Sequence, residues 1–152
     1  MKIVLQRVRE ASVEVAGRLE GEIGRGLCLL IGVEKGDTTE DAVFLAGKAV
    51  ELRIVPDAGG RMNLSLAEVG GEVLAVSQFT LAGSTRRGRR PGFDGAEEPK
   101  RAEELFRLVV DTIRARGFRV ATGVFQAAMD VRLVNEGPVT FILESRRAGL
   151  SR

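Results

Sequence analysis

One uninterrupted apolar run limits the folds that are open to this chain. Residues 26–33 read GLCLLIGV, which has the length of a β-strand and no charged side chain on either face. A strand of this kind is buried on both faces, whereas a half-exposed strand alternates apolar and polar residues. The fold must therefore place this strand inside a sheet and cover the sheet from both sides.

Two amphipathic helices are predicted, and each has one apolar face for a core. The first is predicted to start at a capping box formed by Asp37 and Glu40 and to run to about Leu52. Its apolar positions recur at helical spacing: Ala42, Leu45, Ala46 and Ala49. The second is predicted to start near Pro99 and to stop at Gly117. Its stripe comprises Ala102, Leu105, Phe106, Val109 and Ile113.

Further strands are predicted where apolar and polar residues alternate. Residues 2–17 read as two short strands with Gly17 at a hairpin position, and residues 72–81 read as one strand. Residues 127–134 and 139–145 form a last pair around a turn. Strands outnumber helices and do not alternate with them. The sequence therefore predicts an α+β fold, with largely antiparallel β-sheets packed in layers with two amphipathic helices.

Length and composition favour a single domain without a metal or cofactor. The 152 residues suit one domain, expected at 1–144, and the basic tail 145–152 is expected to be disordered. Histidine is absent and the one cysteine, Cys28, is expected in the core, so the chain lacks the usual metal ligands and the usual neutral-pH base. No apolar run is long enough to span a bilayer and no signal peptide is recognised, which favours the cytoplasm.

The cations are mostly arginine, and four of them lie close together. The chain has 19 Arg and 4 Lys, and the densest cluster is RRGRRP at 86–91. The cluster lies in a predicted loop between residues 82 and 99. It contains Arg86, Arg87, Arg89 and Arg90. Such a loop is either simply solvated or contacts the phosphates of a nucleic acid.

Two short segments carry candidate chemistry. SQFTL ends the predicted strand at 77–81 and opens the basic loop. It is either a strand that ends in polar residues or a binding edge of backbone N–H groups and an amide. NEGPVT, at 135–140, lies between two predicted strands. A Gly-Pro pair there is typical of an ordinary hairpin turn, but also of a close backbone approach to another group.

Together these segments resemble the D-aminoacyl-tRNA deacylases. The similarity is carried by IVLQRVREASVEV, GLCLLIGV, GRMNLSL, SQFTL, RRGRRPGF and FQAAMDVRLVNEGPVT, in the family's order and spacing. It extends from Met1 to about Glu144. Three positions depart from the usual pattern: Glu136 stands where Asp is common, Gly92 where Ser is frequent, and Gln126 where a small residue is frequent.

The resemblance implies an enzyme that hydrolyses the ester between a D-amino acid and the terminal adenosine of tRNA. It implies that glycyl-tRNA is also cleaved and that L-aminoacyl-tRNA is spared. Gly137 and Pro138 would form a cis peptide whose carbonyls enter the active site of the partner subunit in a homodimer. Arg7 and Asn135 would support this turn. A rigid wall of backbone carbonyls rejects the wrong hand by collision rather than by selective attraction.

The resemblance leaves the catalytic step less well determined. Thr80 is a possible nucleophile, but a hydroxyl nucleophile needs an activating base and the chain has no histidine. We therefore favour an oxyanion site made of the N–H groups of Phe79 and Thr80, with the tRNA 2′-hydroxyl assisting an attacking water. Ser77 is assigned to the substrate site, and Gln78 and Phe79 would hold the adenosine. Met129 would line the pocket.

Two other functions remain open on the sequence. A non-catalytic RNA-binding protein would explain the arginines and the missing histidine. An esterase for L-aminoacyl-tRNA or peptidyl-tRNA would differ from the favoured function only in the chirality of its substrate.

Overall fold

The computed structural model describes residues 1–145. The main sheet comprises β1 (Lys2–Val15), β2 (Arg18–Ile23), β3 (Gly26–Gly32), β6 (Glu72–Ser77), β7 (Val120–Thr122) and β8 (Asp130–Glu144). The helices are α1 (Thr39–Glu51) and α2 (Pro99–Ala115), and a small hairpin is formed by β4 (Val55–Pro56) and β5 (Met62–Leu64). Two short 3-10 helices lie at Ala67–Val69 and Phe79–Ala82.

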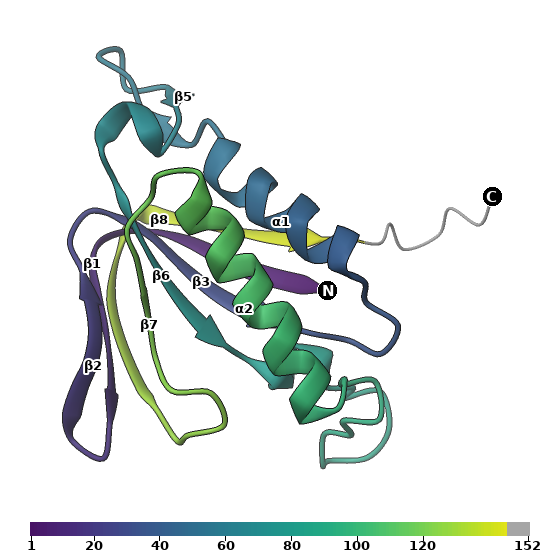
Figure 1. Cartoon of the computed structure of the whole chain (residues 1–152). Coiled ribbons are helices and arrows are strands. Elements are labelled where there is room, and N and C mark those ends of the chain that lie inside the picture. Colours follow the sequence, from purple (N-terminus) through teal and green to yellow (C-terminus); the bar gives the residue numbers. More distant parts are fainter. Residues whose placement is uncertain (146–152) are drawn as a thin grey trace.

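The sheet confirms the α+β prediction and is mixed in direction. Its strand order is β2-β1-β3-β6-β7, and β8 pairs with the other side of β1 (Figure 1). β1 pairs antiparallel with β2, β3 and β8, whereas β3–β6 and β6–β7 are parallel. The parallel pairs arise because α1 lies between β3 and β6 in the chain and α2 lies between β6 and β7, so each connection returns the chain to the same end of the sheet.

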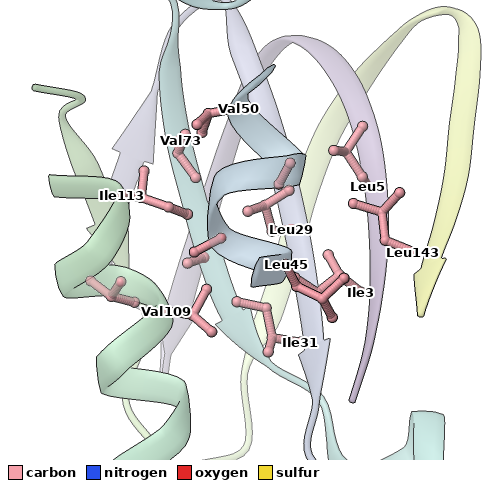
Figure 2. Packing of buried hydrophobic residues seen from close by; sticks show 14 of the residues in the cluster. Ile3, Leu5, Leu29, Ile31, Leu45, Val50, Val73, Val109, Ile113 and Leu143 are labelled. Atoms are coloured by element: carbon pink, nitrogen blue, oxygen red, sulfur yellow. The ribbon is translucent and has the colours of Figure 1, made fainter. Parts of the chain in front are cut away.

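Both helices pack against one face of the sheet. Leu45 and Val50 of α1 and Val109 and Ile113 of α2 are buried there. Figure 2 shows these side chains directed at the strand residues that complete the core, among them Ile3, Leu5, Leu29, Ile31, Val73 and Leu143. The predicted apolar stripes of the two helices are therefore the core-facing stripes.

A second, smaller core covers the opposite face of the central strands. Cys28 of β3 and Leu74 and Val76 of β6 are buried there against Val8 and Val13 of β1. Met129, Val131 and Leu133 pack half-buried against this cluster, as their alternation predicts. The central apolar run is thus covered from both sides: its odd-numbered leucines face the helices, and Cys28 faces the smaller core.

The first predicted strand pair is wrong in one respect. Residues 2–15 form one continuous strand, and the hairpin lies between this strand and β2. Ala16 and Gly17 occupy the turn with φ of 49° and 76°. Positive φ at both central residues suits a two-residue hairpin, so the prediction of a turn at Gly17 is confirmed.

The start of α1 lies one residue later than predicted. Thr38 is the N-cap: its hydroxyl accepts from the N–H of Asp41 at 3.2 Å, and the Asp41 carboxylate accepts from the N–H of Thr38 at 2.8 Å. Asp37 is buried instead and accepts from the α-amino group of Met1 and from the N–H of Glu34. Both sets of residues fit the capping pattern, and the buried ion pair decides between them.

Three further boundaries differ from prediction. The strand that starts at Glu72 ends at Ser77 rather than Leu81, because the chain turns into the Phe79–Ala82 helix. The turn-rich stretch after Pro56 contains β5. β7, which has three residues, was not predicted because so short a segment shows no periodicity. α2 agrees with prediction, and Gly117 follows it with φ of 93°.

The last two predicted strands are one strand with a large bulge. β8 runs beside β1 over its whole length, with Asn135 opposite Val8 and Thr140 opposite Gln6. Residues 136–139 of β8 therefore lie opposite a single residue of β1, Arg7. We call residues 136–139 the Gly-Pro bulge.

Ser145 is the last residue described, and it is tied to the start of the chain. Its N–H donates to the Met1 carbonyl at 3.1 Å, and its hydroxyl accepts from the Met1 α-amino group at 3.0 Å. The rest of the tail for which disorder is expected, residues 146–152, lies outside the described residues.

Candidate functional site

A cavity of about 440 Å³ opens where β3 and β6 end, between the start of α2 and the segment that leads into β8. Its lining is largely apolar, with a few polar groups, as is usual for small-ligand sites. The lining residues include Val76, Ser77, Gln78, Phe79, Glu97, Phe106, Phe125, Gln126 and Met129. The volume is within the range of cavities that hold a small ligand.

The structure brings four of the predicted site residues together at this cavity: Ser77, Gln78, Phe79 and Met129. The first three lie at the end of β6, where Gln78 leaves the sheet after its N–H donates to the Ile31 carbonyl at 2.7 Å. The two rims of the cavity are therefore set by β6 on one side and by the approach to β8 on the other.

The backbone N–H groups of Phe79 and Thr80 point out of the first turn of a 3-10 helix. The first N–H groups of a helix have no intrahelical acceptor. The bonds of this turn start at Leu81, whose N–H donates to the Gln78 carbonyl at 3.2 Å. No acceptor for the N–H of Phe79 or Thr80 lies among residues 1–145. Phe79 lines the cavity, and two adjacent free N–H donors are able to stabilise an oxyanion.

The Thr80 side chain is exposed and is not part of the cavity lining. Its hydroxyl accepts a hydrogen bond from the side-chain amide of Gln78. No carboxylate or amine within the described chain hydrogen-bonds this hydroxyl. Thr80 therefore lacks a base that would activate it.

Several lining residues were not assigned to the site on the sequence. Glu97 brings a carboxylate to the cavity, and its N–H donates to the Val33 carbonyl at 3.1 Å. Phe106 and Phe125 form a tilted aromatic pair with ring centroids 6.2 Å apart. Gln126 has a φ of 64°, which is uncommon for a residue with a side chain. Glu97 and Phe106 lie outside the segments that carry the family resemblance, so the sequence contains no signal for them. Phe125 and Gln126 begin one of those segments, FQAAMDVRLVNEGPVT, but nothing in it assigned them to the cavity.

The Gly-Pro bulge lies on β8, and its peptide Gly137–Pro138 is cis. Arg7 fixes the bulge from β1: its Nε donates to the Glu136 carbonyl at 3.0 Å, and its Nη1 donates to the Ile54 carbonyl at 2.6 Å. Its side chain is only 9% exposed. The Glu136 carboxylate lies 3.7 Å from Arg7 Nε. The planar fork of arginine thus joins β1, the approach to β4 and the bulge.

Asn135 closes the base of the bulge. Its Oδ1 accepts from the N–H of Val139 at 2.7 Å, and its Nδ2 donates to the Thr140 hydroxyl at 3.1 Å. The side chain therefore substitutes for the strand pairing that the bulge interrupts. Arg7 and Asn135 hold the two sides of the same turn.

Gly137 has no room for a side chain. Its φ is 143°, and a Cβ there would lie 2.6 Å from a methyl of Val139 and 3.3 Å from Arg7 Nη2. Glycine is the residue that tolerates this conformation at little cost. The backbone conformation of the bulge therefore requires glycine at residue 137.

The bulge and the cavity do not meet within one chain. Gly137 and Pro138 are exposed, and neither lines the cavity. Val131 near the start of the same strand and Met129 just before the strand do line it. The family resemblance implies that Gly137 and Pro138 act in the active site of the partner subunit, not in that of their own chain. Within one copy of the chain the structure keeps these two residues away from the cavity.

The four clustered arginines lie in an exposed loop next to the cavity. Ser84 and Gly92 pair across the base of this loop through two backbone hydrogen bonds of 2.8 and 2.9 Å. No carboxylate among the described residues is within ion-pair distance of Arg86, Arg87, Arg89 or Arg90. The loop therefore presents unneutralised positive charge.

The remaining chemistry is sparse. Burial raises the pKa of the Cys28 thiol to about 11, so this side chain is an inert core residue. No group of three or more Cys, Asp or Glu side chains within residues 1–145 could hold a metal ion. None of the helices in the described part of the chain is long and apolar enough to cross a membrane.

Comparison with known proteins shows the family. A family model described as D-Tyr-tRNA(Tyr) deacylase matches residues 4–144. A D-aminoacyl-tRNA deacylase of Geobacter sulfurreducens is 58% identical over 146 residues, which cover 96% of each chain. One from Koribacter versatilis is 54% identical and covers 97% of this chain and 99% of the relative.

Solved structures show the same fold. A c-Myc DNA Unwinding Element Binding Protein superposes with a TM-score of 0.90 at 36% identity, covering 97% of this chain and 100% of that chain. A structure described as a probable eukaryotic D-amino acid tRNA deacylase superposes with a TM-score of 0.79 at 18% identity. The superposition covers 93% of this chain and 97% of that chain. On the family match and the identities above, the chain belongs to the D-Tyr-tRNA(Tyr) deacylase family.

Proposed function

We propose that this protein hydrolyses the ester bond of D-aminoacyl-tRNA and releases the free D-amino acid and tRNA. The observation that carries the proposal is the pair of free N–H groups of Phe79 and Thr80 at the rim of a cavity of about 440 Å³. The names of the relatives supply the substrate class. A tRNA substrate places the enzyme in the cytoplasm, where aminoacyl-tRNA is used.

The cavity binds the terminal adenosine of the tRNA substrate. Phe79 and Phe125 offer aromatic surfaces to the base, and Gln78 and Glu97 offer hydrogen-bonding groups. Ser77 and Met129 line the same space. The scissile ester then lies at the rim, next to the two free donors.

The chain acts on the ester by positioning and polarisation. The N–H groups of Phe79 and Thr80 stabilise the oxyanion that forms when water attacks the carbonyl carbon. The adjacent 2′-hydroxyl of the tRNA assists that water. Thr80 contributes its backbone rather than its hydroxyl, because the hydroxyl is bonded to Gln78 and has no base beside it.

The Gly-Pro bulge of a second copy of the chain selects for the D-aminoacyl ester. The bulge is exposed and does not reach the cavity of its own chain, so it can act on a cavity only in another copy. β8 also exposes Val134, Phe141 and Ile142, the last at 67%. An apolar edge of this kind is suited to burial in a homodimer.

In the dimer, the backbone carbonyls of the bulge bind the substrate ammonium and exclude the side chain of an L-amino acid. Arg7 and Asn135 keep these carbonyls fixed. Glycine has no side chain to exclude, so glycyl-tRNA is also cleaved. The selection is a steric one, and it requires a rigid wall.

Hydrolysis must be separated from simple nucleic-acid binding, since the solved relative at 36% identity is named as a DNA-binding protein. The test incubates the purified protein with D-tyrosyl-tRNA and measures both bound tRNA and released tyrosine. Release with many turnovers per enzyme supports the proposal. Binding without release would favour the non-catalytic RNA-binding protein.

Subunit mixing tests whether the bulge serves the partner. Gly137→Ala is expected to lose activity because the bulge has no room for a methyl group at this position. Gln78→Ala is expected to lose activity because Gln78 lines the cavity. In a mixed dimer, one site combines an intact bulge with an intact cavity, so activity returns on mixing. Absence of recovery, with mixed dimers shown to form, would contradict insertion into the partner.

A further inference from the structure

An exposed aromatic pair lies at the rim of the cavity. Phe79 is 60% exposed and Phe93 is 37% exposed, and their ring centroids are 5.1 Å apart with an interplanar angle of 60°. Large aromatic side chains are usually buried, so two in contact at the surface indicate a binding surface. Phe79 lines the cavity and Phe93 does not, so Phe93 extends the aromatic surface outward.

Phe93 is held firmly in place. Its ring packs on Gly83, where a Cβ would lie 3.0 Å from a ring carbon of Phe93. The Ser84–Gly92 pairing ends immediately before Phe93, and the Phe93 carbonyl accepts from the N–H of Ala96 at 3.0 Å. The ring is therefore a pre-formed platform, and little ordering entropy is lost when a flat group stacks on it.

The platform lies between the cavity and the basic loop. The loop with Arg86, Arg87, Arg89 and Arg90 starts after Gly83 and returns to Phe93, beside the start of α2 (Figure 1). A polynucleotide whose last base occupies the cavity leaves it past Phe79 and then past Phe93. Its phosphates next meet cations that have no carboxylate partner among residues 1–145. Charge and aromatic surface thus follow one path.

We propose that Phe93 stacks the penultimate nucleotide of the tRNA acceptor end, while the basic loop contacts the adjoining phosphates. The proposal rests on the function proposed above and adds a second subsite to it. Every base offers a π-face, so stacking on an aromatic side chain suits a site that must accept many tRNAs. The 60° angle between the two rings lets Phe79 and Phe93 serve different bases.

The expected effect is a loss that depends on the length of the substrate. Stacking of one base on an aromatic side chain contributes about 1–3 kcal/mol, which corresponds to roughly a 5- to 150-fold change in binding. Phe93→Ala should therefore raise KM for D-tyrosyl-tRNA by about tenfold, with a much smaller change in kcat. A D-tyrosyl ester of adenosine alone has no penultimate base, so its hydrolysis should fall far less.

The experiment measures kcat/KM for D-tyrosyl-tRNA and for the D-tyrosyl ester of adenosine with each variant. Phe93→Leu keeps apolar packing but loses the π-face, and it serves if Phe93→Ala does not fold. Phe44→Ala is the matched control, because Phe44 is 54% exposed on α1 and does not line the cavity. We divide kcat/KM for D-tyrosyl-tRNA by kcat/KM for the D-tyrosyl ester of adenosine. This ratio is expected to fall for both Phe93 variants and to stay unchanged for Phe44→Ala.

Equal losses on both substrates, or no loss on either, would overturn the second subsite and leave the deacylase function intact. The deacylase function fails in a different way: the unaltered protein would then cleave neither ester. The same assay thus tests the second subsite with the Phe93 variants and the deacylase function with the unaltered protein.

Discussion

Arg7 is a buried side chain that fixes the Gly-Pro bulge to the rest of the molecule. It is the single β1 residue opposite the Gly-Pro bulge, and its two hydrogen bonds reach carbonyls of Glu136 and Ile54. The sequence could predict Arg7 as a support only through the family resemblance. Its second partner, the Ile54 carbonyl, has no signal in the sequence, because any residue supplies a carbonyl.

Arg7→Lys is expected to weaken the bulge while keeping the charge. A lysine ammonium is a point charge and does not bridge two carbonyls in the way a planar guanidinium does. We expect a loss of about 1–3 kcal/mol in the free energy of unfolding, because a buried carbonyl is left unpaired. Selectivity for D- over L-tyrosyl-tRNA should also fall.

Urea unfolding and the two hydrolysis rates check this prediction together. Arg9→Lys is the control, since Arg9 is an exposed residue of the same strand. Unchanged chiral selectivity in Arg7→Lys would show that Arg7 does not position the bulge.

At the scale of elements, the N-terminus of α1 depends on one threonine. The sequence predicted the capping box one residue too early, because Asp37 and Glu40 fit the same pattern as Thr38 and Asp41. The burial of Asp37 against the Met1 α-amino group decides the outcome, and that contact joins residues far apart in the chain. Local pattern alone could not distinguish the two choices.

Thr38→Ala should destabilise the protein by about 1 kcal/mol, which is typical for loss of an N-cap side chain. The matched control is Thr39→Ala, because the Thr39 hydroxyl bonds only the exposed carboxylate of Glu40. The midpoint of urea unfolding checks both variants. Equal shifts for the two would contradict the assignment of Thr38 as the cap.

The β4–β5 hairpin is organised by Asp57. The N–H of Arg61, and next to it the N–H of Gly59 and the Asn63 amide, hold the pKa of Asp57 below its usual value, although partial desolvation opposes the shift. A lowered pKa in the folded state means that the ionised carboxylate stabilises the fold. This contribution is complete above the ordinary Asp pKa of about 4 and is lost as pH falls through the lower folded-state pKa.

Asp57→Asn should therefore be less stable than the unaltered protein at about pH 7, and the difference should shrink as the pH falls below about 4. Urea unfolding at several pH values measures the difference. Asp130→Asn, at an exposed carboxylate at the start of β8, is the control. A difference between Asp57→Asn and the unaltered protein that does not depend on pH would contradict the assigned linkage.

At the scale of the whole molecule, the sequence predicted the elements better than their arrangement. The strand at 26–33 and both helical stripes follow from periodicity, and the structure confirms them. The parallel pairs β3–β6 and β6–β7 and the position of β8 beside β1 are long-range choices that periodicity does not encode. The cavity depends on those choices, which is why Glu97 and Phe106 could not be assigned to it from one sequence.

The charge of the basic loop belongs to the same scale, because it acts on a large anionic partner. If Arg86, Arg87, Arg89 and Arg90 contact phosphates, binding of the tRNA releases counterions from it. Added salt reduces the free energy gained from this release, so KM for D-tyrosyl-tRNA should rise with salt concentration. Replacing all four by Ala should raise KM at low salt and flatten its salt dependence. Replacing Arg101 and Arg107, which pair with Glu104 and Glu103 on α2, is the control. An unchanged salt dependence in the loop variant would show that the tRNA passes elsewhere.

In the proposed mechanism a rigid backbone wall, and not the catalytic groups, decides which esters are cleaved. The most direct test compares hydrolysis of D-tyrosyl-, L-tyrosyl- and glycyl-tRNA by the purified protein under identical conditions. We expect the D-tyrosyl and glycyl esters to be cleaved and the L-tyrosyl ester to survive. Cleavage of both tyrosyl esters at equal rates would contradict chiral selection by the backbone wall. The protein would then still be an aminoacyl-tRNA esterase.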